Sequence, residues 1–126
     1  MIPCTIDHIH LRSLDPVAAS KFYIDLFGAW EMRRVMNGDK LRVVLSLAGL
    51  TLFIEQVPAE TPMLPTPPFL GYEHIGLTVP DIAAAMAIVK ARNIPVVMDL
   101  NVLSPELTIA FIEGPDRVRI ELLQRK

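Results

Sequence analysis

An internal repeat constrains the fold of this chain more than any other feature of its sequence. The nine residues Glu73–Asp81 match the nine residues Asp7–Asp15, with a histidine in second place and an aspartate in last place in both. His8 and His74 are therefore 66 residues apart. A repeat at a fixed offset indicates two structural units of one design, and two such halves are each too short to make a large core alone.

The same offset places one glutamate in each half of the chain. Ile54-Glu55 falls on Ile120-Glu121, so that the histidine and the glutamate of each half are 47 residues apart. A paired recurrence of histidine and glutamate is the main functional signal in the sequence.

Composition excludes several classes of function. The chain has 126 residues, 52% of them hydrophobic, and a formal net charge of −2, so no basic excess indicates nucleic acid or an anionic membrane as a partner. No apolar run is long enough to cross a bilayer, and no signal segment is recognisable. The single cysteine, Cys4, excludes an internal disulfide and suits a reducing cytoplasm.

The first half of the chain reads as a β-α-β-β-β unit. Residues 6–11 alternate like a strand, and Asp15-Pro16 then provides a helix cap followed by proline in the first turn. Gly28 is a plausible end for that helix, and Asn37-Gly38-Asp39 is a hairpin signal. We predict a helix over residues 16–27 and further strands over residues 30–35, 40–47 and 50–57.

The second half repeats the same order after a proline-rich connector. Residues 58–71 contain five prolines and read as a stiff linker between a first module, 1–57, and a second module, 72–126. In the second module Asp81 caps a helix that Asn93 ends. Strands are predicted over residues 72–79, 95–98, 107–113 and 118–123, with a turn at Gly114-Pro115-Asp116.

The repeated histidines and glutamates suggest a metal site. Each pair lies on the first and last strands of its module, and if the modules pair about a pseudo-twofold axis the four side chains converge. Two imidazoles and two carboxylates favour Zn, Ni, Co, Mn or Fe(II). The alternative is that the histidines are core residues and the glutamates lie on solvated edges. Burial of Glu55 and Glu121 among apolar neighbours is costly without a cation or another partner, and this cost favours the metal.

These features resemble the vicinal oxygen chelate superfamily, which includes glyoxalase I, methylmalonyl-CoA epimerase, extradiol dioxygenases and the fosfomycin and bleomycin resistance proteins. The resemblance covers nearly the whole chain. It rests on Asp7-His8-Ile9, Leu11 to Asp15, Phe22-Tyr23, Leu26-Phe27-Gly28, Glu55, Gly71 to Asp81, and Ile120-Glu121-Leu122.

The resemblance implies an α+β fold of two paired βαβββ modules that form a curled, half-barrel mixed sheet around a metal cavity. It implies that a divalent ion is bound by His8, Glu55, His74 and Glu121. It also implies a lyase or isomerase, close to the glyoxalases and epimerases, that acts on a small oxygen-rich substrate through an enolate-like intermediate. One ligand carboxylate then moves the proton, and we favour Glu121 over Glu55 as that base.

Neighbours on the same faces of the strands bear on the substrate. His10 and Arg12 share a face with His8, and Arg119 shares a face with Glu121. We expect His10 to contact substrate or to shuttle a proton. Arg12 and Arg119 are candidates for binding a substrate carboxylate or phosphate, with a solvated strand end as the alternative, and Phe53 occupies in the first module the place of Arg119.

Departures from the named families leave other functions open. The first module lacks the asparagine that glyoxalase I uses for glutathione and the second catalytic glutamate of the epimerases. The alternatives are a non-catalytic binding or resistance protein of the bleomycin type and an Fe(II) extradiol-type dioxygenase, although a fourth ligand at Glu55 argues against redox chemistry. We expect a homodimer, and the ligands may come from one chain or from two.

Overall fold

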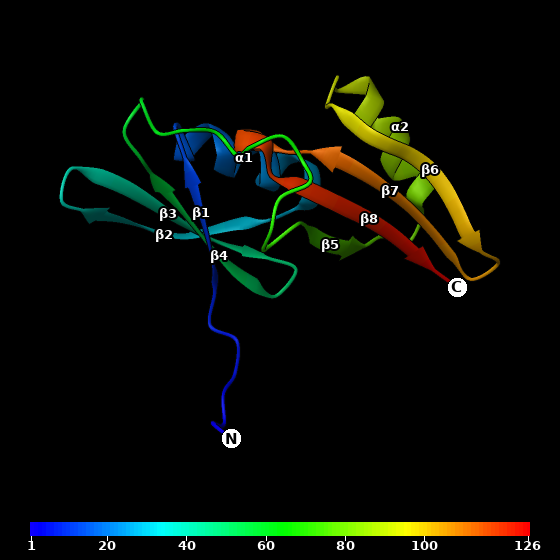
Figure 1. Ribbon diagram of the computed structural model, residues 1–126, viewed down its shortest axis with the longest axis horizontal. Helices are drawn as coiled ribbons and strands as arrows, with labels where there is room; N and C mark the ends of the chain where they lie inside the picture. Colours follow the sequence, from blue (N-terminus) through cyan, green and yellow to red (C-terminus); the bar gives the residue numbers. More distant parts are fainter. The chain divides into compact units, whose positions relative to one another are not determined.

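The computed structural model describes residues 1–126, which fold as two compact units, Met1–Pro62 and Met63–Lys126 (Figure 1). The predicted α+β class with two βαβββ modules is confirmed. The first module consists of β1 (Ile9–Ser13), α1 (Pro16–Phe27), β2 (Trp30–Asn37), β3 (Lys40–Leu47) and β4 (Leu50–Gln56). The second consists of β5 (Ile75–Thr78), α2 (Ile82–Ala91), β6 (Val96–Ser104), β7 (Leu107–Glu113), a short 3₁₀ turn (Pro115–Arg117) and β8 (Arg119–Arg125).

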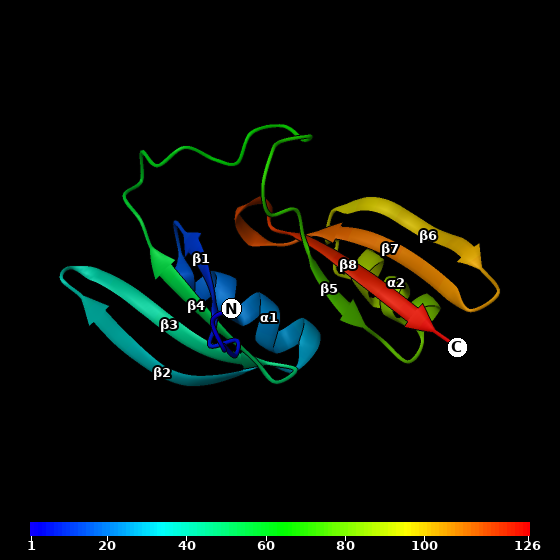
Figure 2. The ribbon, with the colours of Figure 1, turned by 60° about the horizontal axis from the view of Figure 1, so that its bottom comes forward.

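Each module forms its own four-stranded mixed sheet with the same topology. The strand orders are β1-β4-β3-β2 and β5-β8-β7-β6. In both sheets the first and last strands of the module pair in parallel, and the other pairs are antiparallel. Figure 2 shows β1 beside β4 and β5 beside β8. This pairing brings residues about 45 positions apart in sequence onto adjacent strands, because a parallel pair needs a long crossover connection.

The two helices begin and end as the sequence predicts. The side chains of Asp15 and Asp81 accept hydrogen bonds from the backbone N–H groups of Ala18 and Ala84, at 3.1 and 3.0 Å. Gly28 ends α1 in the left-handed region, with a φ of 70°. Neither helix is long and apolar enough to cross a membrane.

Alternation along the last strand of each module separates a buried face from a site face. In β4, Leu52 and Ile54 are buried, whereas Phe53 and Glu55, which alternate with them, are only partly buried. The face that carries Glu55 is called the site face below. In β8, Ile120 and Leu122 are buried, and Arg119 and Glu121 are partly exposed. Successive side chains of a strand point to opposite faces, so both glutamates lie opposite the packed core. Helix α1 packs against β3 and β4, and α2 packs against β6 and β7.

Several strand ends differ from the sequence prediction. Strand β1 begins at Ile9 and continues to Ser13, whereas the alternation predicted residues 6–11. The residues of β1 that pair with β4 are Ile9 to Ser13, and this pairing sets the length of the strand. Ile6 lies outside it and is exposed. Strand β6 is longer than the predicted 95–98 because it pairs with β7 as far as Ser104, through several register shifts that obscure its alternation.

The proline-rich connector does not belong to one module as a whole. The boundary between the two units follows Pro62, inside the predicted linker 58–71, and the segment from Met63 folds with the second unit. Within that unit, Arg117 Nη1 donates a hydrogen bond to the carbonyl oxygen of Leu64 at 3.1 Å. The later part of the connector is therefore bound to the second module at Leu64, although most of its residues are exposed.

The paired helix caps give a direct test of the second module. Replacement of Asp81 by alanine leaves the N–H group of Ala84 without its acceptor and should lower the free energy of unfolding by about 0.5–2 kcal/mol. Replacement by asparagine or serine, which keep the acceptor, should retain most of the stability. Chemical denaturation followed by circular dichroism measures the difference, and equal losses for alanine and asparagine would contradict the capping role.

Candidate metal centre

In the second module His74 and Glu121 lie side by side. The Nε2 atom of His74 is 2.9 Å from Oε2 of Glu121, and the side chains are 29% and 15% exposed. The opposite ring nitrogen, Nδ1, is 3.0 Å from Oε1 of Glu73, the preceding residue. Gly76 lies against Glu121, since a Cβ added there would be in van der Waals contact with Oε2 of Glu121 at 3.7 Å. The imidazole is thus oriented by one carboxylate and directed at another.

His8 of the first module has the same local arrangement. Its Nδ1 atom is 2.7 Å from Oδ2 of Asp7, which again is the preceding residue. The ring stacks on Phe53 with 3.8 Å between ring centroids. Carboxylates commonly bind the ring nitrogen of a metal-ligating histidine that does not face the metal, which fixes the tautomer and the ring orientation. In both modules the acidic residue before the histidine contacts Nδ1, and in the second module Nε2 faces Glu121.

The imidazole beside Glu55, however, is that of His10. Its Nε2 atom is 3.6 Å from Oε2 of Glu55, and no ion pair joins His8 to Glu55. The reason lies in the strand register. In the second module Glu121 pairs with Gly76, and the residue at the same place in the first module is His10. Glu55, however, pairs with Arg12 and not with His10. The parallel pairing of the first module is therefore displaced by two residues relative to the repeat.

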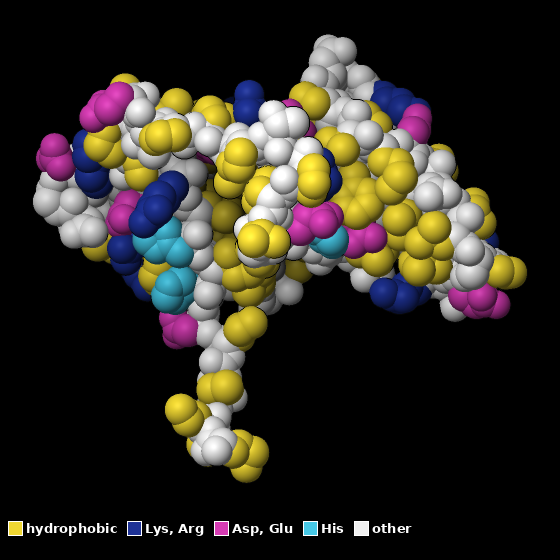
Figure 3. Space-filling view, viewed as in Figure 1, with side chains coloured by type: hydrophobic (Ala, Val, Ile, Leu, Met, Phe, Trp, Pro, Cys, Tyr) yellow, Lys and Arg dark blue, Asp and Glu magenta, His cyan; other side chains and the backbone are white.

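A displacement of two residues preserves the face of every side chain and changes only its neighbour. His10 consequently takes beside Glu55 the place that His74 takes beside Glu121. His8 remains on the same face, with its ring centroid 6.4 Å from that of His10. Figure 3 shows histidine side chains at the surface together with acidic and basic ones. The first module thus offers two imidazoles where the second offers one.

Glu55 is also bound by an arginine that the sequence interpretation overlooked. Arg42 on β3 donates from Nε and Nη2 to Oε1 of Glu55 at 2.9 and 2.8 Å, and Asn37 donates to the same oxygen at 3.4 Å. Burial by itself would raise the pKa of Glu55, but the hydrogen bonds from Arg42 and Asn37 and the charges of Arg42 and His10 outweigh it and lower the pKa. Glu55 is held as a carboxylate.

His10 is held mainly in its neutral form. Burial is the largest influence and lowers its pKa, and the charges of Arg42, Arg12 and His8 act in the same direction. The negative charge of Glu55 opposes them without reversing the result. A neutral imidazole keeps a lone pair with which it can accept a proton or bind a cation.

The second module lacks an equivalent of the Arg42–Glu55 bridge. Phe111, not arginine, pairs with Glu121 across β7 and β8, and its ring lies edge-on to His74 at 5.1 Å. Conversely, Arg119 on β8 and Phe53 on β4 are at equivalent positions of the sequence repeat. The last two strands of each module thus carry one arginine and one phenylalanine on this face in exchanged order: Arg42 on β3 with Phe53 on β4, and Phe111 on β7 with Arg119 on β8. The two glutamates therefore have different electrostatic surroundings.

The remaining predicted site residues lie on the expected faces. Arg12 is exposed and pairs through its backbone with Glu55, and the structure shows no hydrogen bond from its side chain. Arg119 Nη1 is 4.0 Å from Oε1 of Glu73. Arg42, Asn37 and Glu73 were missed. Arg42 was recognisable as the only charged residue between Leu41 and Leu47, a strand that is otherwise almost wholly apolar.

The donor sets fit a divalent ion. Two donors each about 2.0–2.2 Å from one ion lie roughly 3 Å apart when they subtend a right angle, and about 3.5 Å apart at tetrahedral geometry. The His74–Glu121 separation, 2.9 Å, agrees with the right-angle value. No group of three or more His, Cys, Asp or Glu side chains lies close enough together to hold an ion. Neither module by itself therefore brings together the three protein ligands that a zinc site usually has.

Comparison with known proteins places the chain in a family. Residues 5–122 match the model of the Glyoxalase/Bleomycin resistance protein/Dioxygenase superfamily. The chain belongs to this superfamily. A comparison with curated proteins finds no match.

Solved structures share the fold of this superfamily member at low sequence identity. A glyoxalase family protein from Enterococcus faecalis is 23% identical, with a TM-score of 0.80 over 94% of this chain and 96% of the other. The fosfomycin resistance protein FosX from Listeria monocytogenes, solved with Mn(II) and sulfate, is 18% identical, with a TM-score of 0.76 over 99% and 95%. A glyoxalase I variant from Zea mays is 19% identical, with a TM-score of 0.78 over 94% of this chain and 43% of the other.

The Arg42–Glu55 bridge predicts a pH-dependent stability. Replacement of Arg42 by glutamine leaves a largely buried carboxylate without its main donor and should cost about 1–3 kcal/mol at neutral pH. Because the pKa of Glu55 is lowered by folding, the bridge stabilises the fold above the unfolded pKa. That contribution is lost as the pH falls through the folded pKa. The gap between the stabilities of the wild type and Arg42→Gln should therefore close as the pH falls through the lowered folded pKa of Glu55.

Denaturation curves at several pH values measure this gap, and Arg33→Gln, at an exposed position on β2, is the matched control. A gap that stays constant over the whole pH range would show that Arg42 acts through packing and not through Glu55.

Proposed function

We propose that the chain is a divalent-metal-dependent lyase or isomerase that acts on a small oxygen-rich substrate. The observation that supports this most is the acid–imidazole–acid arrangement of Glu73, His74 and Glu121 in the second module, together with the Asp7–His8 pair of the first. In each module a carboxylate orients a histidine, and the last strand supplies a glutamate on the same face. Metal-ligating histidines are typically supported in this way.

The proposed ligands are His74 and Glu121 of the second module, with His8 and Glu55 of the first. A complete site needs both pairs, because one imidazole and one carboxylate leave a divalent ion underligated. Asp7 and Glu73 would fix the tautomers of the two histidines. Zn, Ni, Co, Mn and Fe(II) all suit a mixed nitrogen and oxygen donor set. When bound, such an ion polarises substrate oxygens and stabilises negative charge that develops on them.

Glu121 is the better candidate for the base that moves a proton from substrate carbon. Glu55 is tied to Arg42 and Asn37, which stabilise its ionised form and weaken it as a base. Glu121 contacts only His74 and is not bridged to an arginine. His10, at 3.6 Å from Glu55, would relay a proton between that carboxylate and the substrate. Arg12, Arg119 and Phe53 remain proposed substrate contacts.

The Arg42–Glu55 bridge also favours a second candidate function. If Glu55 stays on Arg42, the remaining donors are His8, His74 and Glu121. Two histidines and one carboxylate are the ligand pattern of non-haem Fe(II) oxygenases. An extradiol-type dioxygenase would consume oxygen in the presence of catechol after loading with Fe(II). A lyase or isomerase would not.

We further propose that the protein acts as a cytoplasmic homodimer. Strand β2 forms an edge of its sheet and exposes Trp30, Met32, Val35 and Met36, and an exposed apolar edge is a surface that a second chain can cover. Cys4 is a free, exposed thiol, which suits a reducing compartment. Light scattering of the purified protein would give the mass of a dimer, and a monomer mass at micromolar concentration would refute this.

Metal content tests the proposed function. We expect the purified protein to bind about one divalent ion per pair of modules, and the variants His74→Gln, Glu121→Gln and His8→Gln to lose it. Glu55→Gln should lose it if four ligands are used and keep it if three are used. His10→Gln should keep the ion and lose turnover, because its role is proton relay.

Elemental analysis after dialysis measures the bound ion, and circular dichroism checks that each variant is folded. Loss of metal in His10→Gln but not in His8→Gln would transfer the ligand role to His10, as the strand register suggests. Absence of metal in the wild type, with no gain in thermal stability on adding Zn, Ni, Co or Mn, would overturn the proposal.

A further inference from the structure

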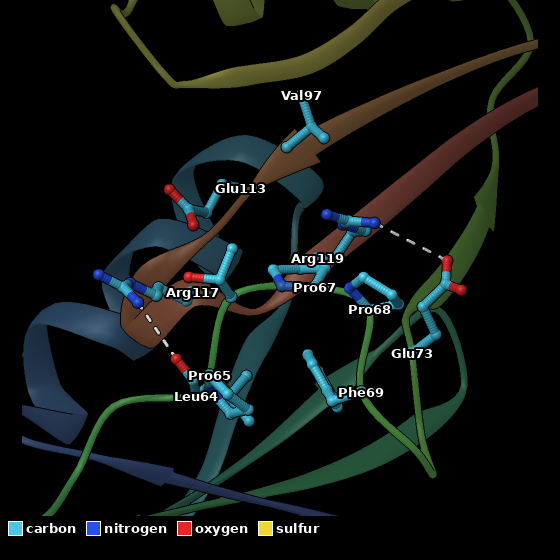
Figure 4. Close-up of a pocket in the computed structure, with 11 residues that line it drawn as sticks. Leu64, Pro65, Pro67, Pro68, Phe69, Glu73, Val97, Glu113, Arg117 and Arg119 are labelled. Atoms are coloured by element: carbon cyan, nitrogen blue, oxygen red, sulfur yellow. Dashed lines mark hydrogen bonds and ion pairs between the residues drawn. The ribbon is translucent and has the colours of Figure 1, made fainter.

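The second module contains a cavity of about 440 Å³ that the proposed chemistry does not by itself explain. Its walls come from the later part of the proline-rich connector, the start of β6, the end of β7 and the start of β8. Figure 4 shows Leu64, Pro67 and Phe69 on one side and Val97 on the other. A cavity of this size, with apolar walls and a few charged groups, is typical of a small-molecule site.

The wall formed by the connector is fixed in place. Arg117 Nη1 donates to the carbonyl oxygen of Leu64 at 3.1 Å, as the dashed line in Figure 4 indicates. Asp116 and Arg117 hold successive positive φ angles of 58° and 61°, a left-handed conformation that costs energy for residues other than glycine. Strained backbone is maintained where the surrounding contacts require it, and here it directs Arg117 at the connector.

Two opposite charges in the cavity have no strong partner. Glu113 and Arg119 are paired through their backbones across β7 and β8, but their side chains form no ion pair with each other. Arg119 has one distant contact, at 4.0 Å from Glu73, and the carboxylate of Glu113 forms no hydrogen bond or ion pair. In the view of Figure 4, Glu113 and Arg119 lie on opposite sides below Val97. Each side chain can bind a ligand group of opposite charge.

We propose that this cavity binds a small zwitterion with an apolar body, such as an α-amino acid with an aliphatic or aromatic side chain. Arg119 binds the carboxylate and Glu113 binds the ammonium group. Val97 and Phe69 contact the apolar part. A ligand with only one charge leaves one of the two protein charges unpaired, and this distinguishes a zwitterion site from a simple anion site.

A zwitterion in this cavity is a substrate only if the proposed function is correct. Arg119 lies two residues before Glu121 on the same face of β8, and Glu73 contacts both Arg119 and His74. A ligand in the cavity therefore lies next to the His74–Glu121 pair. Binding itself needs no metal, so that it can be measured in chelator-treated protein.

The test uses three probes with the same apolar side chain and different charged groups: L-leucine, N-acetyl-L-leucine, which lacks the ammonium group, and L-leucinamide, which lacks the carboxylate. Calorimetric or NMR titration of the full chain should show leucine bound at least about tenfold more tightly than either analogue. Arg119→Gln should abolish the preference for leucine over leucinamide. Glu113→Gln should abolish the preference over N-acetyl-leucine. Arg125→Gln and Glu106→Gln, at exposed positions outside the cavity, are the matched controls.

A further variant separates binding from folding. Arg117→Gly and Arg117→Ala both remove the contact with Leu64, so that both variants should bind leucine more weakly. Glycine also relieves the strain of the positive φ, so that Arg117→Gly should be at least as thermally stable as Arg117→Ala. Equal affinity for all three probes, tighter binding of either analogue, or no binding would overturn the zwitterion site. These outcomes are independent of the metal content, so that failure of this inference and failure of the proposed function are distinguishable.

Discussion

The parallel pairing of the first and last strands in each module is the constraint on which the rest of the structure depends. Histidine and glutamate are far apart in sequence, and only the β1–β4 and β5–β8 ladders bring them onto neighbouring strands. The intervening helix and hairpin are the long crossover that parallel pairing requires. The helix caps, the glycine at the end of α1 and the buried faces of β4 and β8 all support this one arrangement.

Sequence divergence between the two modules has changed the surroundings of the paired residues more than the fold. In the first module the arginine lies on β3 and binds Glu55, whereas in the second it lies on β8 and leaves Glu121 to His74. One carboxylate is thus fixed as an ionised group and the other is left with an imidazole. The two glutamates therefore differ in their binding partners although they occupy equivalent positions in the repeat.

Much of the fold was predictable because it depends on local signals. The offset of 66 identified two modules, and Asp15-Pro16 and Asp81 located the helix starts. The site was less predictable because it depends on strand register. Period-two alternation puts His8 and His10 on one face but does not say which of them lies beside Glu55, since a shift of two residues keeps the alternation. Arg42 escaped notice for a related reason, because its partner lies on another strand.

We propose that two imidazoles and carboxylate oxygens bind one divalent ion. The X-ray absorption spectrum of the zinc-loaded protein tests it most directly, since imidazole rings give a distinct multiple-scattering pattern and sulfur ligands lie at a longer distance of about 2.3 Å. The account predicts about two imidazoles, oxygen donors and no sulfur in the first shell. A shell with sulfur from Cys4, or one with a single imidazole, would contradict it.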